Sequence, residues 1–178
     1  MKVYVCRHGQ TEANRDRVLM GGSMDFPLTE LGEKQAVELG DSLKGVEFDA
    51  VFCSSNQRAK DTLELMEVDC EEVVFDDRLK EQDFGEMAGT CIDDIPADKN
   101  KAYLADPLNH KHVGGESYVE MVERVRNFWD FLQRKEFDCV LVVAHSGIMR
   151  SIESLLMQDT KKGHAERVGN CEVRVYEI

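Results

Sequence analysis

The sequence contains no long apolar run, and this argues against a membrane-spanning helix. Every apolar stretch in the 178 residues is shorter than the roughly 18 residues that a span requires. The N-terminal residues MKVYVCRHGQ reach Arg7 and His8 too early to contain the apolar region of a signal peptide. We therefore expect no membrane partner and a cytoplasmic location.

Clustered cysteines are also missing. The six cysteines form no CxxC pair and are spread along the chain, which favours a reduced interior over a disulfide framework or a zinc site. His110 and His112 would face the same side of an extended segment, but a third metal ligand is not evident. We expect no metal and no cofactor, and we expect this histidine pair to face solvent or substrate.

Positive charge is scarce. Lys and Arg number 22 against 35 Asp and Glu, so the formal net charge is −13. A nonspecific nucleic-acid binder needs a basic face, and this balance argues against nucleic acid as a partner. The length and the 42% hydrophobic content are typical of one folded domain, expected to span residues 1–178. The oligomeric state is left open.

Short β-branched runs alternate with amphipathic segments, which predicts an α/β fold. Strands are expected at residues 2–6, 48–53, 72–75, 138–144 and 171–177, and helices at 29–44, 57–66, 98–105, 117–134 and 148–157. The strand at 138–144 is the most apolar and should be central, whereas the alternating segment 171–177 fits an edge. The expected architecture has three α/β/α layers, a mostly parallel sheet with one antiparallel edge strand, and a small cap from residues 76–115.

Cationic and nucleophilic side chains gather where the predicted strands end. In an open parallel sheet, ligands bind beyond the carboxyl ends of the strands. The residues that follow the first four strands are Arg7 and His8, then Ser54, Ser55 and Arg58, then Arg78 and Glu81, and finally His145, Ser146 and Gly147. On such an acidic chain this group of cations predicts an anionic ligand. Phosphate fits best, because arginine forks and helix N-termini both bind its oxygens.

Two histidines at this edge permit covalent phosphoryl transfer without a metal. A neutral imidazole can attack phosphorus, and a second imidazole can hydrogen-bond the transferring oxygens. Glu81 is the candidate that protonates the leaving alcohol. Arg58 has the alternative role of a surface ion pair, and Arg78 fits a structural salt bridge better than a ligand.

Five segments in order resemble the motifs of the histidine phosphatase, or phosphoglycerate mutase-like, superfamily. They are RHGQTEAN at 7–14, GSMDFPLTELGEKQA at 22–36, CSSNQRAKDT at 53–62, LKEQDFGEMAG at 79–89 and VVAHSG at 142–147, with GGES at 114–117 as a weaker sixth. One such segment alone is modest evidence. Five in the order of the family make a specific match.

The resemblance implies a role for each matching position. His8 would be the nucleophile that becomes phosphohistidine, and Glu81 would be the proton donor and then the base for water. Arg7, Arg58 and His145 would hold the phosphoryl group. Asn14 would contact the phosphate or orient His8. The remainder of the substrate would lie near Gln10, Thr11, Ser23, Ser146 and the segment 110–117.

The resemblance implies a phosphatase that acts on a small phosphorylated metabolite. The short chain is similar to the branch that contains α-ribazole phosphatases, which makes α-ribazole 5′-phosphate one candidate substrate. Departures from the motifs at Ser23, Asn56, Gln82, Met87 and Ala88 leave the substrate open. The acidic surface disfavours a polyanionic substrate, because long-range repulsion would oppose its approach.

Two alternative functions remain. A cofactor-dependent phosphoglycerate mutase would be expected to have a longer insertion and a C-terminal tail that helps to exclude water. Here only residues 90–113 separate FGEMAG from GGES, and the chain ends on a predicted strand, so hydrolysis is favoured. The second alternative is a noncatalytic protein that binds a phosphorylated ligand, because a fold alone does not establish activity.

Overall fold

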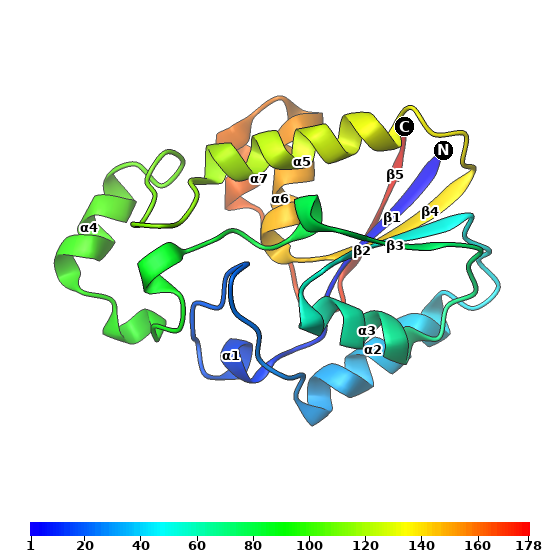
Figure 1. The fold of residues 1–178 in the computed structure, drawn as a ribbon, viewed down its shortest axis with the longest axis horizontal. Helices are drawn as coiled ribbons and strands as arrows, with labels where there is room; N and C mark the ends of the chain where they lie inside the picture. The colour runs from blue at the N-terminus through cyan, green and yellow to red at the C-terminus, as the bar shows by residue number, and fades with distance from the viewer.

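A five-stranded, mostly parallel sheet lies at the centre of the molecule (Figure 1). The computed structural model describes residues 1–178. The strands are β1 (Lys2–Arg7), β2 (Ala50–Ser54), β3 (Val73–Asp76), β4 (Cys139–Ala144) and β5 (Val173–Glu177). Their order is β3-β2-β4-β1-β5, and only β5 pairs antiparallel with its neighbour. The expected sheet, with one antiparallel edge strand, is confirmed.

The most apolar strand is central, as its sequence predicts. β4 pairs with β1 on one side and with β2 on the other, with Val142 opposite Val5 and Phe52. Strands buried on both faces need apolar residues at every position rather than at alternate positions. Val140 and Val142 enter one core and Leu141 and Val143 the other.

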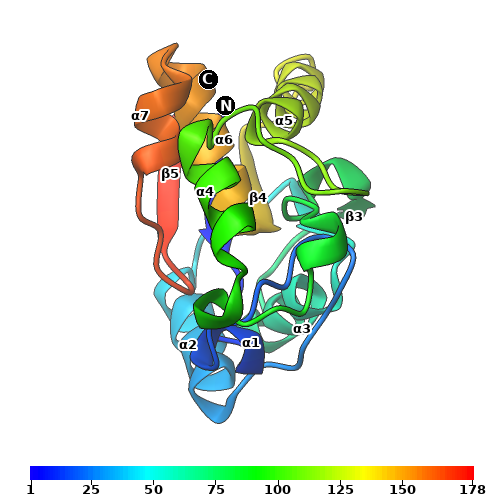
Figure 2. The same cartoon turned by 90° about the vertical axis from the view of Figure 1, so that its left-hand side faces the viewer.

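Helices cover both faces of the sheet and make three layers. They are α1 (Glu12–Arg15), α2 (Glu30–Ser42), α3 (Gln57–Met66), α4 (Ala97–Ala105), α5 (Tyr118–Leu132), α6 (Ser146–Met157) and α7 (Thr160–Ala165). Helices α2 and α3 lie on one face, and α5 and α6 lie on the other (Figures 1 and 2). None of these helices is both long enough and apolar enough to cross a membrane.

Helix α5 buries the stripe that its sequence predicts. Tyr118, Val122, Val125, Trp129 and Leu132 are all buried against the sheet. The helix begins with a capping box, in which the side chains of the first and fourth residues of Ser117–Glu120 satisfy each other's backbone N–H groups. This apolar face anchors the segment that precedes it, which borders the site described below.

Residues 76–115 connect β3 to α5 and extend beyond the carboxyl ends of the strands, as the small cap that the sequence predicts (Figure 1). They contain three 3-10 turns, at Asp77–Leu79, Gly85–Met87 and Ile92–Asp94, followed by α4. Helix α7 was not expected, since its charged sequence suggested solvated chain. It forms because Asp159 caps two backbone N–H groups and buried Gly163 packs closely on α6.

Candidate active site

A pocket of about 130 Å³ lies at the carboxyl ends of the central strands. Six of the ten site residues expected from the sequence line it, and they come from five separate segments of the chain. They are Arg7, His8, Asn14, Arg58, Glu81 and Ser146. The remaining lining residues are Val18, Met20, Gly21, Phe84 and Arg150.

His8 follows β1 and is buried at the base of the pocket. Its Nδ1 lies 2.7 Å from the carbonyl oxygen of Gly9. A carbonyl only accepts, so Nδ1 carries the hydrogen, and a neutral ring then has its lone pair on Nε2. Burial, and then the charges of Arg58 and Arg7, hold the pKa of His8 well below 6.5. The neutral imidazole is therefore the form present at neutral pH.

His145 follows β4 and is fully buried beside His8. The ring centroids of the two histidines are 5.2 Å apart, at an angle of 61°. Nε2 of His145 shares a hydrogen bond of 2.8 Å with Oγ of Ser54, whereas its buried Nδ1 has no partner. Burial, followed by the charge of Arg58, lowers the pKa of His145 well below 6.5.

Arg58 is held rigidly and is not a surface ion pair. It lies in the first turn of α3 and is 1% exposed. It donates to Oδ1 of Asp25 at 2.6 Å and to the carbonyl oxygens of Met24 and Gly21 at 3.0 and 2.9 Å. Arg7 donates to a single acceptor, the carbonyl oxygen of residue 168, at 2.7 Å. The Nε atoms of both arginines are buried without a partner.

Glu81 lies against the N-terminus of α6. Its Oε2 accepts hydrogen bonds from the backbone N–H of Gly147 at 3.2 Å and from Oγ of Ser146 at 3.3 Å. The other carboxylate oxygen, Oε1, accepts from the backbone N–H of Gln82 at 3.0 Å. Both carboxyl oxygens of Glu81 are thus positioned by hydrogen bonds, one by the start of α6 and the other by the next residue of its own segment.

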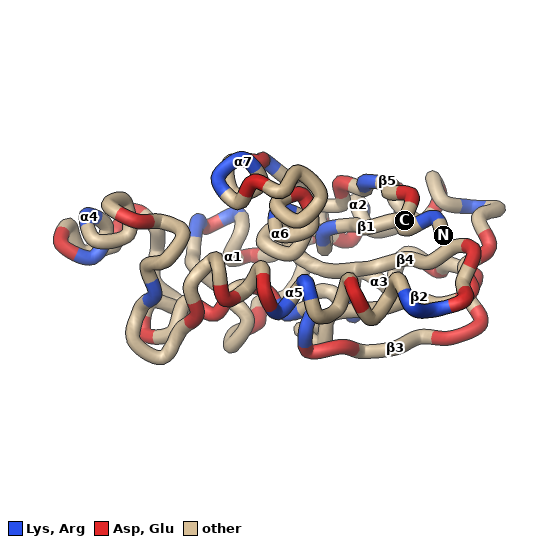
Figure 3. Tube along the Cα trace, turned by 90° about the horizontal axis from the view of Figure 1, so that it is seen from above, with Lys and Arg blue, Asp and Glu red and all other residues tan.

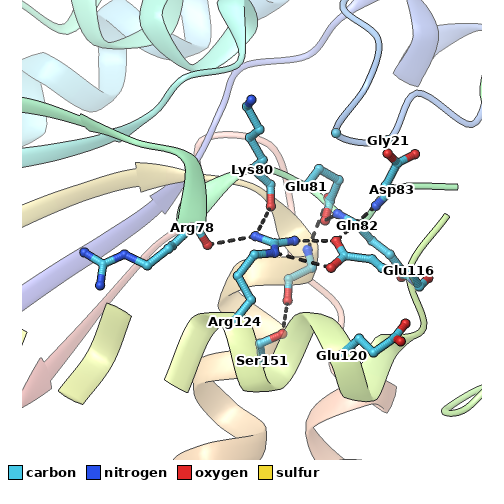
Figure 4. A network of polar contacts seen from close by, with 12 residues as sticks. Gly21, Arg78, Lys80, Glu81, Gln82, Asp83, Glu116, Glu120, Arg124 and Ser151 are labelled. Atoms are coloured by element: carbon cyan, nitrogen blue, oxygen red, sulfur yellow. Dashed lines mark hydrogen bonds and ion pairs between the residues drawn. The ribbon is translucent and has the colours of Figure 1, made fainter. Parts of the chain in front are cut away.

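Arg124 of α5 holds the segment that carries Glu81 (Figure 4). It donates to the carbonyl oxygens of Arg78 and Lys80 at 2.8 and 2.9 Å, and it also pairs with the carboxylate of Glu116. That carboxylate in turn accepts a hydrogen bond of 3.1 Å from the backbone N–H of Asp83. The backbone on both sides of Glu81 is thus fixed by one arginine–carboxylate pair.

Four of the ten expected residues do not line the pocket. They are His145, which is fully buried, and the predicted substrate contacts Gln10, Thr11 and Ser23. Oε1 of Gln10 accepts a hydrogen bond of 2.9 Å from Thr29, and buried Thr11 caps α1. Oγ of Ser23 donates to Asp83 at 3.1 Å, in a separate open groove of about 510 Å³. Their part in substrate binding therefore stays a prediction.

Two polar side chains at or beside the pocket were not expected, in addition to its apolar lining. Arg150 lines it, and its position four residues after Ser146 places both on one face of α6, a spacing from which it could have been found. Asn170 donates to the carbonyl oxygen of His8 and to Oδ1 of Asn14, both at 3.1 Å. No pattern in the sequence indicates Asn170, because it lies 162 residues from His8.

The lining of the pocket is positively charged, although the molecule as a whole is acidic. Three arginines and one glutamate line it, whereas Asp and Glu are spread along the whole chain (Figure 3). No group of three or more His, Cys, Asp or Glu side chains could hold a metal ion. His110 and His112 lie together outside the pocket, with Nε2 of one 3.4 Å from Nδ1 of the other. All six cysteines are free.

Comparisons with known proteins agree with this arrangement. Residues 3–178 match the family described as the histidine phosphatase superfamily, branch 1. A Schizosaccharomyces pombe protein named "Probable phosphatase" is 32% identical over 89% of this chain and 75% of its own length. A Salmonella paratyphi A protein named "Probable phosphoglycerate mutase GpmB" is 32% identical over 70% of this chain and 60% of its own.

Among solved structures, the α-ribazole phosphatase from Shigella flexneri is similar over 100% of this chain and 91% of its own, with 28% identity and a TM-score of 0.91. These matches confirm the expected enzyme class, a phosphatase. The family match covers nearly the whole sequence, and it agrees with the order of the motifs and with the pocket at the strand ends. The chain belongs to branch 1 of the histidine phosphatase superfamily.

Proposed function

We propose that the protein hydrolyses a small phosphomonoester through a phosphohistidine on His8. The observation that carries this proposal is the hydrogen bond from Nδ1 of His8 to Gly9, which leaves the Nε2 lone pair free in a pocket lined by arginines. A neutral imidazole with a defined tautomer is a nucleophile, and the arginine guanidinium groups offer donors for phosphoryl oxygens.

The first step transfers the phosphoryl group to the enzyme. Nε2 of His8 attacks phosphorus, the bond from phosphorus to the ester oxygen breaks, and Glu81 in its acid form protonates the departing alkoxide. Arg7 and Arg58 offset the charge on the phosphoryl oxygens. We also assign a contact with these oxygens to the unpartnered Nδ1 of His145, which is buried beside His8 but is not among the residues that line the pocket.

The second step returns the phosphoryl group to water. Glu81, now a carboxylate, accepts a proton from water as the water oxygen attacks phosphorus. The bond between phosphorus and Nε2 of His8 breaks, and inorganic phosphate leaves. Water can reach Glu81 from the polar groove of about 510 Å³ that Glu81 also lines, and this access favours hydrolysis over retention of the phosphoryl group.

The named relatives supply two candidates for the natural reaction. The Shigella flexneri structure makes α-ribazole 5′-phosphate a substrate to test. The mutase name of the Salmonella relative makes phosphoglycerate mutase activity the second candidate. The two differ in the final acceptor, which is water in the first case and a sugar acid in the second.

The test is turnover of p-nitrophenyl phosphate and α-ribazole 5′-phosphate in the presence of a metal chelator, with parallel trapping of an acid-labile phosphoenzyme. His8→Ala should abolish turnover and the phosphoenzyme, and Glu81→Gln should slow turnover by about 100-fold or more. Glu136→Gln removes an exposed carboxylate and should change neither.

Three outcomes would contradict the proposal. A phosphoenzyme that forms but hydrolyses very slowly would favour the mutase. Undiminished turnover by His8→Ala would remove His8 from the mechanism. Phosphate binding without turnover of any ester would favour the noncatalytic ligand-binding alternative.

A further inference from the structure

A second cavity of about 160 Å³ lies under the cap. It is formed by the turns around Phe84 and Ile92, by helix α4 and by the segment 110–112. Its apolar wall consists of Leu19, Phe84, Ile92, Ile95 and Tyr103. This cavity takes no part in the phosphoryl transfer described above.

The cavity adjoins the phosphate pocket. Phe84 lines both, so its ring forms part of the wall between them. The two sites also alternate along the sequence. Leu19 of the cavity stands between Val18 and Met20 of the pocket, and Gln82 of the cavity directly follows Glu81. The cavity and the phosphate pocket are therefore neighbours that share Phe84, and the leaving group of an ester bound at His8 would lie next to the cavity.

The cavity offers no free cation for a second anionic group. Nζ of Lys99 lies 2.5 Å from a carboxylate oxygen of Glu86, and Nζ of Lys111 lies 2.8 Å from one of Glu120. Both lysines of the lining are thus paired with carboxylates outside it. Glu116, the acidic residue of the lining, is likewise paired with Arg124, so no lysine or carboxylate of the lining is left unpaired.

The polar part of the lining is suited to a neutral ring. His110 and His112 pack edge to face with centroids 4.7 Å apart, and Tyr103 lies edge to face with His110 at 6.2 Å. Aromatic side chains in this arrangement present both flat apolar faces and hydrogen-bonding edges. The volume is close to the roughly 150 Å³ of an engineered apolar protein cavity that holds benzene.

We propose that this cavity binds a neutral aromatic ring on the leaving group of the substrate. The inference rests on the proposed function and deepens it, because it defines the substrate class as a phosphomonoester of an alcohol that carries a ring on a short spacer. The phosphate pocket holds the reacting group, and the cap cavity selects among esters by the remainder of the molecule.

The experiment compares benzyl, 2-phenylethyl and 3-phenylpropyl phosphate with propyl phosphate, which lacks the ring. At least one ring ester should exceed propyl phosphate by tenfold or more in kcat/KM. Fructose 1,6-bisphosphate tests the opposite class and should not exceed propyl phosphate. Equal kcat/KM for propyl phosphate and every ring ester, or a clear preference for the bisphosphate, would overturn the inference.

Cavity-filling variants locate the effect. Ile95→Trp and Ile92→Trp place a large side chain in the lining and should each reduce the ratio of ring-ester to propyl-phosphate kcat/KM to near one. Leu104→Trp is the matched control, because the Leu104 side chain is 66% exposed on α4 and does not line the cavity. It should keep the wild-type ratio. A preference that survives both filling variants would place the ring elsewhere.

A binding measurement separates this inference from the proposed function. The alcohol 3-phenylpropanol carries the ring without a phosphate, and it should shift the methyl NMR signals of Leu19, Ile92 and Ile95 in the wild type but not those of distant methyl groups. Binding without turnover of any ester would refute only the proposed function. Turnover without these shifts, and without a ring preference, would refute only the cavity assignment.

Discussion

The contact between Glu81 and Gly147 leads to a sharp test of the proton donor. A Cβ atom added at Gly147 would lie 2.1 Å from Oε1 of Glu81 and 3.0 Å from Cε of Met121. Ordinary contacts of a Cβ atom begin near 3.4 Å, so Gly147→Ala must displace the Glu81 carboxylate by about 1 Å. The methionine methyl group is the flexible end of its side chain and can move aside.

A displacement of this size should slow the chemistry strongly while the fold is kept. Misplacement of a catalytic group by about 1 Å can cost on the order of 100-fold in rate. Alanine is favoured over glycine within a helix by about 1 kcal/mol, so α6 should not be weakened. We expect Gly147→Ala to unfold at a temperature near that of the wild type and to transfer the phosphoryl group from an alkyl ester about 100-fold more slowly.

Rapid-quench measurement of phosphoenzyme formation separates the acid from the other site groups. Propyl phosphate needs a proton on its departing oxygen, whereas p-nitrophenolate leaves readily without one. The Gly147→Ala variant should therefore lose much less rate with p-nitrophenyl phosphate than with propyl phosphate. This difference between the two esters is expected only if the displaced group donates the proton.

Gly169→Ala is the matched control for this prediction. A Cβ atom added there would meet its nearest neighbour, Oε2 of Glu172, at 3.6 Å, which is an ordinary contact. This variant should keep wild-type rates with both esters. An equal loss for both esters in Gly147→Ala would show that the substitution disturbs the phosphate pocket as a whole. Wild-type rates with propyl phosphate would refute Glu81 as the proton donor.

Three further predictions concern stability. Arg124→Met removes the hydrogen bonds to two carbonyl groups and the ion pair with Glu116, which keeps only its hydrogen bond from Asp83. It should lower the free energy of unfolding in urea by about 2 kcal/mol, whereas exposed Arg126→Met should change it by less than about 0.5 kcal/mol. Ser54→Ala removes the only side-chain hydrogen bond of buried His145 and should lower the free energy of unfolding by about 1–3 kcal/mol in the same assay. An unchanged free energy of unfolding would show that this hydrogen bond does not stabilise the fold. Below pH 6.5 the unfolded chain binds a proton at each of the two buried histidines that the folded chain does not bind, so the free energy of unfolding should fall as the pH falls. His8→Asn should reduce the slope of the free energy of unfolding against pH by about 1.4 kcal/mol per pH unit. An unchanged slope would contradict the lowered pKa of His8.

The sheet could be predicted because its signals are local. The four parallel strands contain short apolar runs, of which the central strand β4 has the longest, and the edge strand β5 alternates apolar and polar residues. The set His8, Arg58, Glu81 and Ser146 could also be predicted to meet, because each follows a strand and parallel strands end at one edge. Family membership, expected from the order of the motifs, is confirmed.

The partners that hold this set could not be predicted, because they lie far away in the sequence. Asp25 binds Arg58 across 33 positions, and Arg124 binds the carbonyl group of Lys80 across 44. Neither pairing follows a helical or strand period, so a single sequence contains no signal for it. These partners become visible only when packing brings their segments together.

The motif at residues 7–14 shows why spacing alone does not separate chemistry from scaffold. Thr11 and Asn14 satisfy each other's backbone N–H groups in the capping box of α1, so both are needed for the local fold. Only Asn14 also lines the pocket, where its Oδ1 accepts a hydrogen bond from Asn170. Which residues of the motif face the pocket depends on the strand they follow and on a partner near the other end of the chain. The residues of one motif therefore divide between substrate contact and loop geometry, and only the three-dimensional contacts distinguish the two.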